Sequence, residues 1–155
     1  MLEIFQSLIG VLTGDSTLTA MVPASNIMVG FVDVVTEKQV DLLMPQINLH
    51  LVSEVSRSVP SNTRDTMVQI DIWGRTSQLE IINIYERIIT LLNYTSPLQG
   101  STKIFWERLG GAVDQYESDR GIWHRAMTYN VWEQKGATTL LSVSDTTPMG
   151  ESVTI

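Results

Sequence analysis

The sequence predicts a single α+β domain: a mostly antiparallel, mixed β-sheet with an N-terminal helix and one long amphipathic helix packed on one face. Three observations support this prediction. Apolar residues recur at helical spacing near the N-terminus and again over residues 77–93. The segments beginning near residues 46, 68, 104 and 122 alternate apolar and polar residues, as strands with one buried face do. Strands grouped around one strong helix are typical of α+β folds.

The first element is a helix that we expect to end at Gly14. Its apolar residues share one stripe at i, i+3, i+4 and i+7 spacing: Leu2, Phe5, Leu8, Ile9 and Leu12. Asp15 or Ser16 then caps a short helical turn, which Pro23 ends. Residues 24–44 are expected to be mostly irregular, with short strands considered at 27–29 and 31–35.

Two strands are expected after Pro45. Each has an apolar residue at every second position: Ile47, Leu49 and Leu51 in the first, and Val68, Ile70 and Ile72 in the second. Between them lies the polar segment RSVPSNTRDT, which ends at Thr66 and has loop composition.

The long helix is predicted over residues 77–93. Ser77 stands three residues before Glu80, the spacing of a capping box in which each side chain accepts a hydrogen bond from the other residue's backbone N–H. We expect one apolar face on this helix: Leu79, Ile82, Tyr85 (or Glu86), Ile89 and Leu92.

The remaining elements are predicted to be strands. One runs over residues 104–109, where Gly110-Gly111 marks a turn, a bulge or a close backbone approach, and then continues over 112–116. Residues 117–121 have hairpin-turn composition, and 122–132 form a long alternating strand. After Gly136 the chain becomes rich in Ser and Thr. We therefore expect one domain over 1–136 and a C-terminal tail over 137–155.

Composition excludes several classes of protein. The chain has 155 residues, no cysteine and a net charge of −7. Without cysteine there is no disulfide framework, thiolate-bound zinc or Cys nucleophile. The acidic charge argues against a surface that grips nucleic-acid phosphates. No apolar run reaches the ~18 residues of a membrane span, and the N-terminus does not have the pattern of a signal peptide.

Sequence motifs point to no catalytic, metal or cofactor site. His50 and His124 lie in separate predicted strands, and no HExxH or Gly-x-Ser-x-Gly motif and no phosphate-binding glycine loop occurs. A Ser–His–Asp triad of distant residues stays open. Asp114, Glu117 and Asp119 form the densest carboxylate group but lack calcium-loop spacing, which favours a solvated hairpin turn. We therefore expect a protein that is not an enzyme.

Two features suggest contacts with other proteins. The first is a set of tryptophans in or beside the strands: Trp73, Trp106, Trp123 and Trp132. Tryptophan is enriched at protein interfaces, but these side chains equally fit the cover of a second sheet face within the fold. The second feature is the tail, which we expect a neighbouring subunit to hold; docking on its own domain is the alternative.

Four stretches carry a resemblance to a known family: LTGDSTLTAMVPASNIMVG, MPQINLHLVS, MVQIDIWGRTSQLEIINIYERIITLLN and RGIWHRAMTYNVW. In their order and spacing they resemble the tail terminator (tail-completion, or head-to-tail joining) proteins of long-tailed bacteriophages. The resemblance covers about residues 1–133. The chain departs from the family at Pro45-Gln46, where Pro-Tyr is frequent, and in its longer tail.

The resemblance implies a non-enzymatic ring, commonly a hexamer, without cofactors. Such a ring binds the last ring of the tail-tube protein, stops its polymerisation and offers a surface to a neck or head-completion protein. It resides at the tail–neck junction of the virion after assembly in the host cytoplasm. DNA passes through its lumen without specific binding, which an acidic chain suits.

Six residues are our candidates for the subunit and tube interface: Arg57, Pro60, Arg64, Trp73, Trp132 and Ile155. Other functions remain as alternatives to a terminator. They are another neck component (a stopper or adaptor), a tail-tube subunit and, more distantly, a small α+β enzyme.

Overall fold

The structure is a computed structural model that describes residues 2–30, 43–56, 63–93, 98–99 and 102–135. Its elements are α1 (Leu2–Thr13), α2 (Ser16–Met21), the 3-10 turn η1 (Ala24–Asn26), β1 (Ile27–Val29), β2 (Gln46–Ser56), β3 (Thr63–Gly74), α4 (Gln78–Leu92), β4 (Leu98–Gln99), β5 (Thr102–Glu117) and β6 (Ile122–Lys135). The strands form one sheet in the order β1-β2-β3-β6-β5-β4. Within the described ranges β1 and β2 are the one parallel pair, so the predicted α+β domain with a mixed sheet is confirmed.

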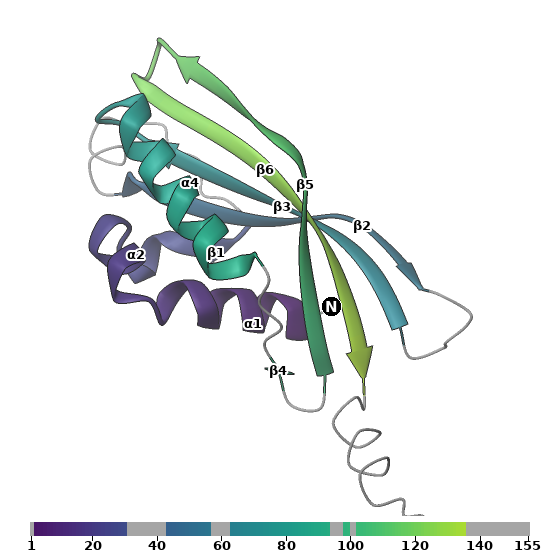
Figure 1. Cartoon of the computed structure of the whole chain (residues 1–155). Coiled ribbons are helices and arrows are strands. Elements are labelled where there is room, and N and C mark those ends of the chain that lie inside the picture. The colour runs from purple at the N-terminus through teal and green to yellow at the C-terminus, as the bar shows by residue number, and fades with distance from the viewer. Residues whose placement is uncertain (1, 31–42, 57–62, 94–97, 100–101, 136–155) are drawn as a thin grey trace, which may run out of the picture.

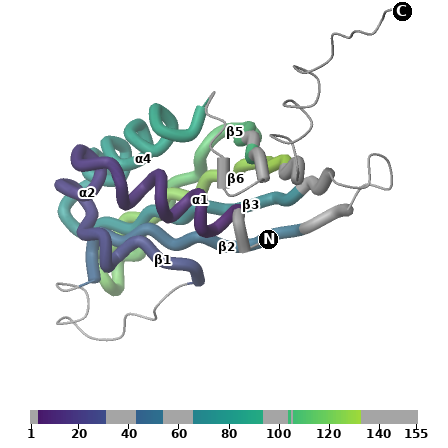
Figure 2. Tube along the Cα trace, turned by 90° about the horizontal axis from the view of Figure 1, so that it is seen from below, coloured from purple at the N-terminus to yellow at the C-terminus, as the bar shows by residue number. Residues whose placement is uncertain are grey.

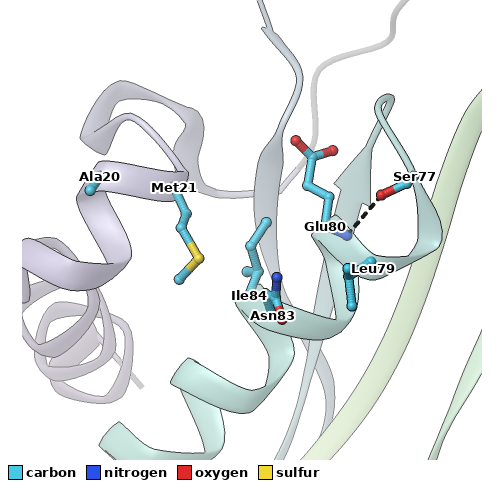
Figure 3. Close-up of a pocket in the computed structure, with 7 residues that line it drawn as sticks. All are labelled: Ala20, Met21, Ser77, Leu79, Glu80, Asn83 and Ile84. Atoms are coloured by element: carbon cyan, nitrogen blue, oxygen red, sulfur yellow. Dashed lines mark hydrogen bonds between the residues drawn. The ribbon is translucent and has the colours of Figure 1, made fainter.

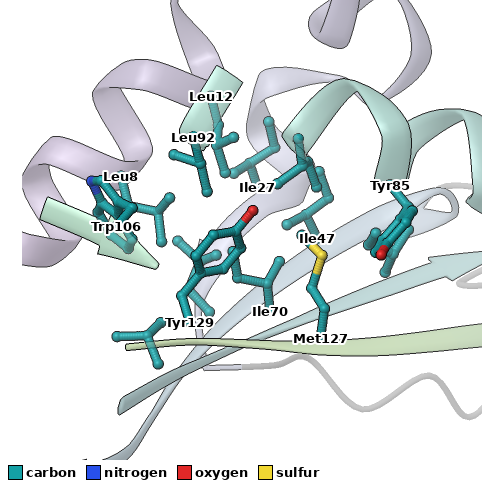
Figure 4. Packing of buried hydrophobic residues seen from close by; sticks show 14 of the residues in the cluster. Leu8, Leu12, Ile27, Ile47, Ile70, Tyr85, Leu92, Trp106, Met127 and Tyr129 are labelled. Atoms are coloured by element: carbon teal, nitrogen blue, oxygen red, sulfur yellow. The ribbon is translucent and has the colours of Figure 1, made fainter. Parts of the chain in front are cut away.

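The three helices pack on one face of the sheet (Figures 1 and 2). Strand residues at every second position point toward them and are almost fully buried, as in Ile47 of β2, Ile70 of β3 and Tyr129 of β6. Figure 4 shows Met127 and Tyr129 projecting from β6 toward Leu92 and Leu12. Trp106 meets Tyr129 edge to face, with ring centroids 6.0 Å apart. Among the described residues, α1, α2 and α4 all lie on this side of the sheet and none of them covers the opposite face.

The capping box at α4 is confirmed in one half and altered in the other. The Ser77 hydroxyl accepts the Glu80 N–H at 3.2 Å, as expected. The Glu80 carboxylate, however, reaches beyond Ser77 and accepts the N–H groups of Arg75 at 3.1 Å and Thr76 at 3.3 Å. Glu80 therefore fixes the turn that leads from β3 into the helix.

The buried stripe of α4 differs from the predicted one. The residues that face the core are Ile81, Ile84, Tyr85, Ile88 and Leu92. Leu79 is 63% exposed, and Ile82 and Ile89 are only partly buried. The prediction was wrong because this helix has apolar residues nearly all round, so that two overlapping stripes fit the same helical period.

At the N-terminus α1 ends before Gly14 and Asp15 caps α2, as predicted. The Asp15 carboxylate accepts the Leu18 N–H at 2.8 Å. It also accepts two hydrogen bonds from Arg87 of α4, at 2.8 and 2.7 Å. Mainly because of the Arg87 hydrogen bonds, the pKa of Asp15 is lowered to about 2. One carboxylate thus starts α2 and fastens it to the long helix.

The predicted loop between β2 and β3 is too long. β2 extends to Ser56 and β3 begins at Thr63, so Thr63–Thr66 belong to a strand. Their polar side chains suggested a loop, but β3 lies between β2 and β6 and both neighbours bond its backbone. Pairing on two sides outweighs the local composition. Residues 57–62 lie outside the described ranges.

The hairpin of β5 and β6 matches its prediction. Its turn closes with hydrogen bonds from the Arg120 and Gly121 N–H groups to the Glu117 carbonyl. Gly110-Gly111 marks a bulge, because three residues of β5 lie between the pairs Leu109↔Thr128 and Val113↔Ala126 where β6 has one. Gly110 has φ +65, a conformation that favours glycine. The Arg108 guanidinium donates to the Gly110 carbonyl at 3.2 Å and holds the bulge.

Candidate interaction surfaces

The sheet face opposite α1, α2 and α4 is called the outer face below. Strand register places its residues in rows across β2, β3 and β6: Asn48, Asp71 and Ala126 in one row, His50, Gln69 and Thr128 in the next, and Gln46, Trp73 and His124 in a third. This face mixes polar and aromatic side chains, whereas the helix-covered face is almost entirely apolar. It is the part of the sheet on which side chains are arranged for polar contacts.

A buried carboxylate, Asp71, lies at the centre of this face. The residue is 3% exposed and accepts hydrogen bonds from His50 Nε2 at 2.6 Å, His124 Nε2 at 2.8 Å and Gln69 Nε2 at 2.9 Å. Burial alone raises the pKa of Asp71, but the hydrogen bonds from His124 and Gln69 and the nearby imidazoles outweigh it, so the pKa is lowered. Because an ionised carboxylate only accepts, both Nε2 atoms carry their protons.

Trp73 is part of the same arrangement. Its ring stacks on His124 with centroids 3.9 Å apart and planes within 4°. It also packs with Ile122, Leu43 and Met44 in a small apolar cluster separate from the main core. The structure thus places Trp73, an interface candidate, half-buried against its own chain at one end of the outer face.

The hydrogen bonds of this cluster fix its geometry. Each imidazole directs Nε2 at the Asp71 carboxylate, which sets the orientation of the ring. No group of three or more His, Cys, Asp or Glu side chains within the described residues is arranged to hold a metal ion. The sequence pattern placed His50 and His124 in separate strands and did not predict the cluster. The available signal was that both, like Asp71, fall on the polar side of an alternating strand.

The other interface candidates have different locations. Trp132 lies on the outer face near the end of β6 and is 42% exposed, opposite Asp65 of β3. Arg64 is the second residue of β3, paired with Ser56 and Glu133. Arg57, Pro60 and Ile155 lie outside the described residues. Within that part of the chain, Trp73 and Trp132 are therefore brought to the same face but not together.

The remaining tryptophans belong to the helix side. Trp106 is 6% exposed within the main core. Trp123 packs against that core and lies beside the Tyr116 ring, with centroids 4.7 Å apart. Trp106 and Trp123 therefore pack on the helix side, whereas Trp73 and Trp132 lie on the outer face, where a role in an interface stays a prediction.

The carboxylates of Asp114 and Glu117, near the β5–β6 turn, are paired with arginines and do not form a cation site. Asp114 accepts two hydrogen bonds from Arg125, at 2.6 and 2.8 Å, and one from Gln78 at 2.8 Å. The Arg125 hydrogen bonds lower the pKa of Asp114. Glu117 pairs with Arg120 in the turn. Arg125 also lies 4.5 Å above the Tyr85 ring. These contacts fasten the first turn of α4 to the sheet.

A shallow, open groove of about 400 Å³ lies between α2 and the first turns of α4 (Figure 3). Met21 of α2 points across it toward Ile84, and the exposed Leu79 lies at its rim. The lining carries one carboxylate, Glu80, which already holds the turn before α4. The groove is lined by polar as well as apolar side chains and is too open to enclose a small molecule.

The two edges of the sheet differ. One ends in the three-residue β1, which pairs with Ile47–Leu49 of β2. At the other edge β4 covers β5 only at Thr102 and Lys103. From Ile104 to Glu117, β5 has β6 as its one strand neighbour among the described residues. The backbone groups of such an edge point outward and are available to another strand.

No helix in the described ranges is both long and apolar enough to cross a membrane. No family model and no curated protein matches the chain. Among solved structures, the fold is similar to that of a chain in the virion of a native gene transfer agent (GTA) particle, with a TM-score of 0.61 and 9% sequence identity. The match covers 82% of this chain and 91% of that chain. At this identity the likeness establishes a shared fold.

Proposed function

We propose that this chain is a non-enzymatic structural protein of a phage-type virion. In this proposal it forms a ring, by resemblance a hexamer, at the head-proximal end of the tail tube. There it stops tube polymerisation and joins the tail to the neck of the filled head. The observation that carries the proposal is the shared fold with a chain of a virion particle, which extends over 91% of that chain.

The two dissimilar sheet edges also favour a ring. Head-to-tail contacts that close into a ring require two different patches on each subunit. The short β1 and the long β5, which within the described ranges β4 covers only at Thr102 and Lys103, are two such patches at opposite ends of one sheet. An exposed edge of this kind invites association with another chain.

The net charge of −7 fits the proposed passage of DNA. An acidic lumen repels phosphates, so that DNA slides through without the tight binding that a basic surface gives. The proposed partners are other copies of the chain, the tail-tube protein and a neck or head-completion protein. The proposed location is the tail–neck junction, after assembly in the host cytoplasm.

The decisive experiment is electron microscopy of particles produced without this protein. The proposal expects overlong tails that are not attached to heads, because the tube then lacks its stop and its joint. Tails of normal length joined to heads would refute it. Tails of normal length beside unattached filled heads would instead favour a stopper or adaptor, and the absence of any tube would favour a tail-tube subunit.

Residues 57–64, which include the start of β3, are our proposed contact with an acidic neighbour or the tube. Arg57 and Arg64 give this stretch two positive charges within an acidic chain. Replacing both by Glu should impair joining and leave the thermal unfolding of the isolated protein unchanged. The matched control reverses two arginines elsewhere, Arg75 and Arg120. Normal virion yield with the first double variant would contradict this role.

A further inference from the structure

The Val113–Glu117 segment of β5 is suited to receive another strand, because among the described residues it pairs with β6 alone. It follows the bulge, which interrupts the edge and gives the segment a defined beginning. Val113 is 65% exposed and Tyr116 is 52% exposed. The segment contains neither Lys nor Pro, two residues with which natural proteins blunt sheet edges. An added strand here would pair the free backbone groups and cover apolar side chains.

The charged residues of this segment do not obstruct such a strand. The Asp114 carboxylate is held by Arg125 and Gln78 on the helix side. The Glu117 carboxylate is held by Arg120 in the turn. A Cβ at Gly111, just before the segment, would meet nothing within 4 Å. Packing within the chain therefore does not require glycine there, and the open space suits the approach of a second backbone.

The C-terminal tail contains a segment of matching character, TTLLSVS, over residues 138–144. It consists of Thr, Leu, Val and Ser, carries no charge and ends before Asp145 and Pro148. Thr and Val favour strands, and an uncharged segment of this length suits pairing along a sheet edge. Its leucines and valine would cover the exposed Val113 and Tyr116 side chains.

The length of the chain decides whether its own tail or the tail of a neighbouring copy can pair with Val113–Glu117. The tail leaves β6 at Lys135, which is level with Thr102 at the far end of β5, whereas Val113 is level with Ala126. The path from Lys135 to the level of Ala126 is nine residues of strand, or roughly 30 Å. Thr138, three residues beyond Lys135, extends at most roughly 10 Å. Ser144, nine residues beyond Lys135, extends at most roughly 30 Å, so that only the last residue of the chain's own segment could reach the level of Val113 and the segment could not pair along Val113–Glu117.

We propose that residues 138–144 of one copy add a strand to the Val113–Glu117 edge of β5 in a second copy. The proposal rests on the ring of the proposed function and supplies one of its contacts. Because the donor and the acceptor are different parts of the chain, every subunit gives one strand and receives one, as a closed head-to-tail ring requires.

The absence of cysteine makes this contact testable by cross-linking, since introduced thiols are the only ones present. Full-length Val113→Cys and Leu141→Cys proteins are mixed and treated with a short bismaleimide, and products are identified by denaturing gel and peptide mass spectrometry. The matched control pairs Leu141→Cys with Val29→Cys, which is 51% exposed on β1 at the opposite edge. We expect a cross-linked dimer with Val113→Cys and at least a tenfold weaker product with Val29→Cys.

A second arm distinguishes contacts between chains from contacts within one chain. The double variant Val113→Cys/Leu141→Cys is diluted into excess wild-type protein before cross-linking. The inference expects the cross-link of the double variant to disappear on this dilution, so a cross-link that persists within single chains would overturn it. No product in the mixture of the two single-cysteine proteins would also overturn it. Negative-stain imaging of the same samples is scored separately. Rings without the cross-link would overturn this inference and leave the proposed function standing. Cross-linked chains that never form rings would overturn the proposed function if, in addition, virions lacking the protein show normal joining of heads and tails.

Discussion

Replacing Asp71 by alanine should destabilise the protein more than its position on the outer face suggests. The substitution removes the acceptor of three hydrogen bonds, from His50, His124 and Gln69. The loss is unequal among the donors. The His50 side chain is 29% exposed and can bond to water, but the His124 side chain is 16% exposed and stacks on the Trp73 ring.

The expected cost follows from these exposures. A buried donor left without a partner costs ~1–3 kcal/mol, and hydrogen bonds to charged groups are stronger than average. With His124 contributing most of the loss, we expect Asp71→Ala to lower the free energy of unfolding by about 2 kcal/mol. Asp71→Asn keeps the size and one acceptor oxygen, so we expect about half that effect.

Urea unfolding at neutral pH measures this effect. A loss of about 2 kcal/mol lowers the midpoint by about 1 M urea when the slope is ~2 kcal/mol per M. Asp119→Asn, in the exposed hairpin turn, is the matched control and should leave the midpoint unchanged. A midpoint for Asp71→Ala within error of wild type would refute the reasoning.

The pH dependence gives a second check on Asp71. Because its pKa is lowered on folding, its contribution is fully present above the ordinary Asp value of ~3.9 and is lost as the pH falls through the lower, folded value. The difference between wild type and Asp71→Ala should therefore be largest near neutral pH and shrink below about pH 4. A difference that grows in acid would contradict the assignment.

Three further predictions concern the supporting structure. Tyr129→Phe removes a hydrogen bond from a fully buried hydroxyl to Asn93 Oδ1 and should cost about 1 kcal/mol in urea unfolding, with normal secondary structure by circular dichroism. Gly110→Ala places a side chain at φ +65 and should cost about 1–2 kcal/mol, which an unchanged melting temperature would disprove. Ser77→Ala removes the cap on the Glu80 N–H and should cost about 1 kcal/mol; a normal urea midpoint would contradict the capping role.

Local signals predicted the elements well. The Ser77–Glu80 spacing placed the start of α4, and strand alternation placed β2, β3, β5 and β6. The same signals did not fix which side of α4 is buried, because a helix with apolar residues on several sides can rotate without changing its pattern. They also predicted too short a strand for β3, since the polar residues from Thr63 to Thr66 are paired by strands whose residues lie elsewhere in the sequence.

The Asp71 cluster could not be predicted from any one segment of the sequence. His50, Asp71 and His124 meet only because β3 lies between β2 and β6, and because the register brings their positions into adjacent rows. A shift of one residue would move each side chain to the other face of the sheet. Strand order and register depend on long-range packing, which no local pattern contains. The proposed interface residues depend on partners outside the chain and stay predictions.

The strand pairs of the sheet also differ in how far apart their residues lie along the chain. β5 and β6 form one hairpin, closed by the turn at Glu117–Gly121, and β2 and β3 are consecutive strands of another antiparallel pair. The seam between them joins residues 63–74 of β3 to 123–134 of β6. Closing such a long loop is slow compared with forming a hairpin. We therefore expect the two hairpins to form first and the docking of β3 on β6 to limit the folding rate, so that each chain completes its core before it presents both edges to a neighbour.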